Sequence, residues 1–150
     1  MRLVTRADWD GLVCAVLLST VEHIDVIQFT TPAEIQAGAV SIPVDSVIAN
    51  LPFHPNAALW FDHHVSEEAR GAHMAAGFKG RFAAAPSAAR LIYEFYRDDG
   101  RVRRFAELVD ATDRVDSAQL TLEDVVSPAG YVLLAYTLDP RTGLEDLDRE

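Results

Sequence analysis

Residues 2 to 20 read Arg-Leu-Val-Thr-Arg-Ala-Asp-Trp-Asp-Gly-Leu-Val-Cys-Ala-Val-Leu-Leu-Ser-Thr, and this stretch is the strongest indication of the fold. Residues 2–5, with the apolar pair Leu3 and Val4, are typical of a strand, and residues 11–20 are apolar on nearly every side, which predicts a buried helix. Two carboxylates, Asp8 and Asp10, lie between them. The order strand, acidic loop, helix is typical of α/β proteins.

The rest of the chain continues to alternate strands and helices, without the paired turn residues of β-hairpins. Further strands are expected at 24–29, 46–48 and 57–61, with a short one near Phe82 in the weakly periodic segment 66–85. Helices are expected at 32–36, 86–96, 102–112, 121–125 and 128–138. We therefore predict an α/β fold with a mostly parallel sheet of about five strands and helices on both faces.

Length and composition indicate one domain spanning residues 1–150. The chain has 150 residues, 49% of them hydrophobic, and can bury about two thirds of its unfolded surface in one core. A lone cysteine, Cys14, excludes an intramolecular disulfide. The sequence shows neither a leader pattern nor a run of about 18 apolar residues, so we expect a cytoplasmic protein that does not enter the membrane.

The net charge is strongly negative, with a formal value of −10 and an isoelectric point near 4.8. An extended nucleic-acid surface needs clustered lysine and arginine, which this chain mostly lacks, so we expect none. A small anionic substrate would need local positive charge, and bound divalent metal ions would supply it. No pattern in the sequence decides between a monomer and a homodimer.

A second polar cluster, Phe61-Asp62-His63-His64, lies where a buried strand is expected to meet solvent. Open α/β sheets bind ligands at the carboxyl ends of their strands, so this is where chemistry is expected. Asp8 and Asp10 occupy alternate positions and can face one cleft, where they could share one or two divalent cations. The alternative is that both carboxylates only stabilise the N-terminus of the following helix.

These motifs resemble the DHH superfamily of metal-dependent phosphoesterases, which is named for its Asp-His-His segment. Asp62-His63-His64 matches that segment, and Asp8-Trp9-Asp10-Gly11 matches the first motif of the family. The similarity is strongest to the exopolyphosphatase-like branch, through residues 5–15, 50–52 and 60–64. The superfamily also contains inorganic pyrophosphatases, single-strand exonucleases, and phosphodiesterases of nano-RNA or cyclic dinucleotides.

The resemblance implies a role for each polar residue of the two motifs. Asp8 and Asp10 would bind a pair of Mn²⁺ or Mg²⁺ ions with His63 as a third protein ligand. The mixture of imidazole and carboxylate favours Mn²⁺. His64 would contact the phosphate or protonate the leaving oxygen, and Asp62 would orient a histidine.

The family's fourth motif, an aspartate after a helix, best matches Asp113, with Asp110 and Asp116 as rivals. This chain departs from the family at two other positions. Asn50 stands where an aspartate usually bridges two metal ions, and a neutral amide is a poorer bridge. Arg6 stands where a further ligand often occurs. It cannot bind a cation but could clamp a phosphate oxygen, so a single ion is an alternative to two.

Most family members also carry a C-terminal substrate-binding domain, which we expect to be absent from this chain. Arg141, a positively charged residue near the C-terminal end of the sequence, is then expected near the substrate. Arg6 and Asn50 are the other residues expected to contact the substrate. The function implied is a metal-dependent phosphohydrolase in which water attacks phosphorus in polyphosphate or a short phosphodiester. The alternatives are a phosphate- or nucleotide-binding module without catalysis and a purely structural domain.

Overall fold

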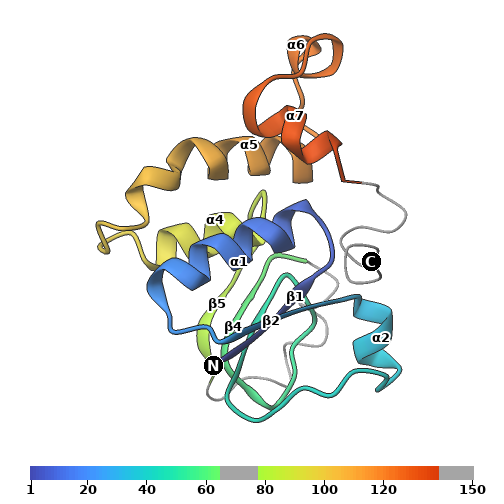
Figure 1. The fold of residues 1–150 in the computed structure, drawn as a ribbon, viewed down its shortest axis with the longest axis vertical. Coiled ribbons are helices and arrows are strands. Elements are labelled where there is room, and N and C mark those ends of the chain that lie inside the picture. Colours follow the sequence, from blue (N-terminus) through green and yellow to red (C-terminus); the bar gives the residue numbers. More distant parts are fainter. Residues whose placement is uncertain (65–77, 139–150) are drawn as a thin grey trace.

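A five-stranded parallel sheet with the order β2-β1-β3-β4-β5 forms the centre of the computed structural model, which describes residues 1–64 and 78–138 (Figure 1). The strands are β1 (Arg2–Arg6), β2 (Val26–Thr30), β3 (Ser46–Ala49), β4 (Ala57–Asp62) and β5 (Lys79–Phe82). All pairings are parallel. The strand order reverses between β1 and β3, and the crevice at such a switch point is the usual ligand site of open α/β sheets.

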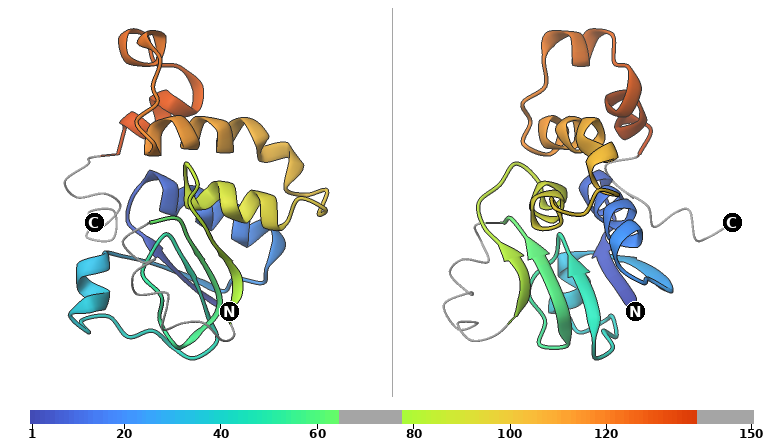
Figure 2. Two further views of the ribbon diagram at one scale, coloured as in Figure 1. Left: turned by 180° about the vertical axis from the view of Figure 1, so that it is seen from behind. Right: turned by 90° about the vertical axis from the view of Figure 1, so that its left-hand side faces the viewer.

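Helices pack in two further layers above one face of this sheet (Figures 1 and 2). α1 and α4 lie directly on the sheet, and α5 packs on the far side of both. The helices are α1 (Trp9–Val21), α2 (Pro32–Gln36), α4 (Ala88–Phe95), α5 (Ala106–Asp116), α6 (Leu122–Val126) and α7 (Gly130–Tyr136), with the 3₁₀ turn η2 (Arg103–Phe105) before α5. Within the described ranges, no helix has the length and apolar character needed to cross a bilayer.

Side chains of successive strand residues alternate between two apolar clusters, one on each face of the sheet. Leu3 and Phe61 join the cluster beneath α1 and α4, whereas Val4 and Trp60 join the cluster on the opposite face. The opposite face is covered by α2 and by the connection from β3 to β4, whose Leu51 is fully buried. This connection spans only residues 50–56 and contains no helix.

The predicted α/β fold, with its parallel sheet and helices on both faces, is confirmed, including the short strand near Phe82. The clearest difference is α5, which continues to Asp116 instead of ending near Thr112. The acidic segment remains helical because the apolar face of α5 continues through it. Leu108 and Thr112 are buried, and Val115 packs against the main core. This extra turn brings Asp116 toward the carboxyl ends of the strands.

The first turn of α1 packs tightly against the end of β1, and Gly11 makes this approach possible. A Cβ atom at position 11 would collide with the backbone carbonyl of Arg6. The absence of a side chain therefore lets the loop carrying Asp8 and Asp10 close over the end of β1.

Replacing Gly11 by alanine is expected to lower the free energy of unfolding by at least about 2 kcal/mol, because backbone must move to admit the methyl group. Gly100→Ala is the matched control, since its Cβ would meet no atom within 4 Å. Urea denaturation of both variants measures the difference. Equal stability of the two variants would contradict this account of the packing.

Candidate metal centre

The carboxylate of Asp10 is buried in the first turn of α1, with only 1% of the residue exposed. It accepts hydrogen bonds from the backbone N–H groups of Ala88 at 2.8 Å and Ala89 at 2.9 Å. These are orphan donors at the N-terminus of α4, where the helix dipole favours negative charge. Burial, followed by the charge of Asp116, raises the pKa of Asp10 to about 8, although both backbone donors lower it.

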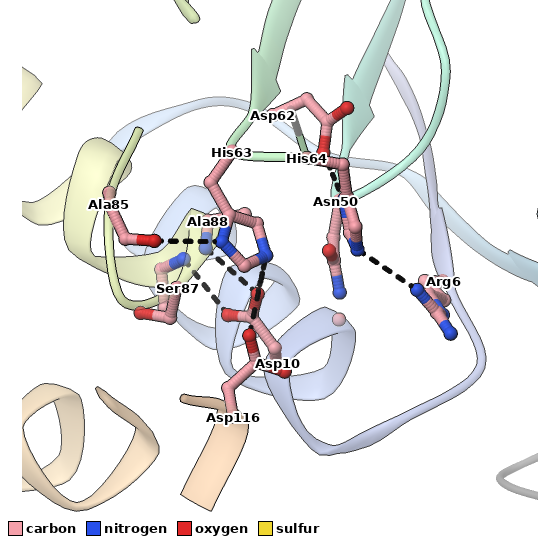
Figure 3. Close-up of polar contacts among 12 residues, drawn as sticks. Arg6, Asp10, Asn50, Asp62, His63, His64, Ala85, Ser87, Ala88 and Asp116 are labelled. Carbon is pink, nitrogen blue, oxygen red and sulfur yellow. Dashed lines mark hydrogen bonds and ion pairs between the residues drawn. The ribbon is translucent and has the colours of Figure 1, made fainter. Parts of the chain in front are cut away.

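His63 follows β4 and directs its Nε2 atom toward two carboxylates (Figure 3). Its Nδ1 lies 3.0 Å from the carbonyl oxygen of Ala85, which can only accept, so Nδ1 carries a proton. Nε2 is 3.7 Å from Asp10 Oδ2 and 3.3 Å from Asp116 Oδ2. This nitrogen is buried and has no hydrogen-bond partner among the described residues. In the neutral ring, its lone pair therefore points between the two carboxylates.

Asp116 completes this group from the last turn of α5. Ligand atoms of Asp10, His63 and Asp116 all lie within 4.8 Å of one another. Burial raises the pKa of Asp116, whereas the neighbouring His63 lowers it. Two carboxylates and an imidazole are a donor set that suits Mn²⁺ and other first-row divalent ions. A bound cation would offset the carboxylate repulsion and give Nε2 a partner, so the three residues could hold a metal ion.

Asp113, predicted from the sequence as the fourth ligand, lies outside this group, and Asp116 takes its place beside His63. The Asp113 carboxylate instead accepts hydrogen bonds from Ser87 Oγ at 2.6 Å and Arg90 Nε at 2.8 Å. Arg90 also pairs with Asp110 at 2.6 Å. Asp113 thus fastens α5 to the start of α4, the segment that binds Asp10.

Asp62 and His64 form a second polar group at the end of β4. Asp62 is fully buried, and its Oδ1 accepts a hydrogen bond from His64 Nδ1 at 2.7 Å. This bond raises the pKa of His64, whereas partial burial lowers it. His64 Nε2 lies 3.1 Å from Arg6 Nη1 (Figure 3). The two adjacent histidines thus contact different groups, although their ring centroids are only 4.4 Å apart.

Asp8 lies near the group formed by Asp10, His63 and Asp116, but both of its carboxylate oxygens contact other residues. Oδ1 accepts from the backbone N–H of Gly11 at 2.8 Å and from Asn50 Nδ2 at 3.0 Å. Oδ2 pairs with Arg6 Nε at 2.8 Å. Asn50 follows β3 in the left-handed conformation, with a φ of 57°, and its Oδ1 is buried without a partner among the described residues. Arg141 lies outside the described residues.

Sequence reasoning missed the backbone groups that position the site. The N–H groups of Ala88 and Ala89 and the carbonyl of Ala85 carry no residue-type signal. Ser87 did carry one, because Pro86-Ser87 marked the start of a helix. Ser87 caps α4 by accepting from the backbone N–H of Arg90 at 3.0 Å, and this cap fixes the donors that bind Asp10.

No protein-family model matches the sequence, and no curated protein matches it either. Among solved structures, the chain is similar to one described as the pGpG-specific phosphodiesterase PggH from Vibrio cholerae. The sequences are 43% identical, the TM-score is 0.75, and the match covers 95% of this chain and 46% of that one. The present chain therefore spans about half the length of the phosphodiesterase that it resembles.

The pKa shift of Asp10 predicts a pH-dependent stability for the metal-free protein. A carboxyl with a raised folded-state pKa holds a proton that the unfolded chain has already released. Stability is therefore lost as pH rises from the unfolded value of 3.8 toward about 8. The raised pKa of His64 acts in the same direction. The thermal midpoint, measured in chelator, should fall by several degrees between pH values of about 5 and about 8.

Asp116→Asn should flatten this pH dependence, because it removes the charge that contributes most, after burial, to the raised pKa of Asp10. Asp110→Asn is the control on the same helix, and its slope should match that of the wild type. A slope that is unchanged in Asp116→Asn would contradict the coupling between the two carboxylates.

Proposed function

We propose that this chain is the catalytic domain of a DHH-family phosphodiesterase and that it hydrolyses short phosphodiesters in a metal-dependent reaction. The observation that carries this proposal is the buried Nε2 of His63, which has no partner among the described residues and lies 3.3 Å from Asp116 and 3.7 Å from Asp10. The 43% identity to a pGpG-specific phosphodiesterase supports both the family and the reaction class.

Asp10, His63 and Asp116 would hold the ion, with Asp116 replacing Asp113 as the fourth-motif ligand. Mn²⁺ is proposed over Mg²⁺, because Mg²⁺ prefers ligand sets made only of oxygen. When bound, the ion supplies the electrophilic charge that hydrolysis of a phosphoester requires. The backbone donors of α4 would hold the Asp10 carboxylate in place for the ion.

His64 would act on the substrate itself, by contacting the phosphate or by protonating the leaving oxygen. Asp62 is a positioning residue, because its hydrogen bond to Nδ1 fixes the ring with Nε2 facing Arg6. The same bond raises the pKa of His64, whereas partial burial lowers it. His64 Nε2, which lies 3.1 Å from Arg6 Nη1, is the atom that would contact the phosphate or, once protonated, pass a proton to the leaving oxygen.

The proposed substrate is a short phosphodiester such as pGpG rather than polyphosphate. The exopolyphosphatase-like motifs contain the residues expected around the phosphate. Polyphosphate and phosphodiesters both contain phosphate, so these motifs do not distinguish the two substrates. The phosphodiester is favoured because the similar solved structure is described as a phosphodiesterase. Its description names pGpG, and an acidic chain with few lysine and arginine residues suits a short substrate better than a long polyanion.

His63→Ala is expected to weaken Mn²⁺ binding by at least roughly tenfold and to abolish pGpG hydrolysis, because it removes the only imidazole of the proposed donor set. His23→Ala is the control, since the His23 side chain is 91% exposed and remote from the group. Calorimetric Mn²⁺ titration and product analysis, with pGpG and polyphosphate in parallel, measure both effects.

Two results would contradict this assignment. Unchanged metal-dependent hydrolysis in His63→Ala would exclude the proposed centre. Absence of turnover on either substrate, combined with thermal stabilisation by pGpG in chelator, would instead identify a nucleotide-binding module without catalysis.

A further inference from the structure

The carboxylate of Asp8 adjoins the proposed metal centre, yet its oxygens are already engaged. One accepts from Gly11 and Asn50, and the other pairs with Arg6. A carboxylate in this arrangement anchors a guanidinium instead of presenting a free oxygen to a second ion. Its single negative charge is balanced by the single positive charge of Arg6.

We propose that Arg6, held by Asp8, is the second cation of the active site and that the protein binds one divalent ion rather than two. The guanidinium would bind a phosphoryl oxygen of the substrate opposite the single ion. This inference rests on the proposed function, because it assigns the phosphate-binding residue of that same site.

The contacts of Arg6 leave it suited to this task. Nε is used by Asp8 at 2.8 Å, and one N–H of Nη1 lies against His64 Nε2 at 3.1 Å. Among the described residues, the remaining N–H groups of Nη1 and Nη2 have no partner and could form the paired hydrogen bonds with which arginine recognises phosphate. The Arg6 side chain is 38% exposed, so a substrate can reach it. His64 and Arg6 would then face the same phosphoryl group.

Asn50 removes the negative charge that a second dication would need. Its amide donates to Asp8, and its buried Oδ1 has no partner among the described residues. A neutral amide and a carboxylate already paired with arginine give little net attraction for a second ion, and the guanidinium repels one. Restoring a carboxylate at position 50 and removing the guanidinium should therefore create a second cation site.

Mn²⁺ titration by calorimetry and electron paramagnetic resonance counts the ions directly and needs no turnover. The wild type and Asn50→Asp should each bind one ion, because Arg6 remains in place in both. Arg6→Ala/Asn50→Asp should bind two ions and show the spectrum of a coupled Mn²⁺ pair. Arg2→Ala is the matched control at the opposite end of β1, where Arg2 contacts Gln28, and it should bind one ion.

Inorganic phosphate is the second probe, titrated into Mn²⁺-saturated protein. Arg6→Ala should weaken phosphate binding by about tenfold, which corresponds to about 1.4 kcal/mol, and Arg2→Ala should leave it unchanged. These single variants and the wild-type stoichiometry test the proposal even if the double variant fails to fold.

Two ions in the wild type, or equal phosphate affinity in Arg6→Ala and wild type, would overturn this inference while leaving the proposed phosphodiesterase intact. A wild type that binds no ion and hydrolyses no pGpG would overturn the proposed function, and the inference with it.

Discussion

The hydrogen bonds from the backbone N–H groups of Ala88 and Ala89 to the buried carboxylate of Asp10 are the interaction on which the site depends. They join the first turn of α1 to the N-terminus of α4. Four of the five strands lie between these two helices in the sequence. Ser87 and Asp113 then join α4 to α5, whose last turn supplies Asp116. The packing of the helices therefore also positions the carboxylates. α4 binds Asp10 through its backbone N–H groups and binds α5, which carries Asp116, through Ser87.

Much of this arrangement follows from sequence, because the ends of parallel strands meet at one edge of the sheet. That rule predicts that Asp10, which follows β1, and His63, which follows β4, lie close together, and the structure brings them within 3.7 Å. The rule does not decide between the acidic residues of α5: the resemblance favoured Asp113 with Asp110 and Asp116 as rivals, and the structure places Asp116 beside His63. The choice depends on how α5 is rotated about its axis, and tertiary contacts fix this rotation, among them the buried hydrogen bond from Trp9 Nε1 to Thr112 Oγ1 at 3.1 Å. A tertiary contact of this kind has no local sequence signal.

The overall field of an acidic protein repels anions, so the proposed phosphodiester substrate would need positive charge placed locally. The formal charge of −10 makes this requirement severe. The structure offers two sources of such charge side by side, a three-residue group suited to a divalent ion and an arginine anchored by Asp8. The three-residue group supplies positive charge only when an ion is bound to it. Burial raises the pKa of Asp10, so ionising this carboxyl is costly without a cation nearby.

The most direct test of the central claim is a crystal structure of the Mn²⁺-soaked protein with anomalous scattering measured near the manganese edge. We expect a single anomalous peak within bonding distance of His63 Nε2 and of carboxylate oxygens from Asp10 and Asp116. A peak on Asp8 or Asp113 with none beside His63, or no peak at saturating Mn²⁺, would contradict it.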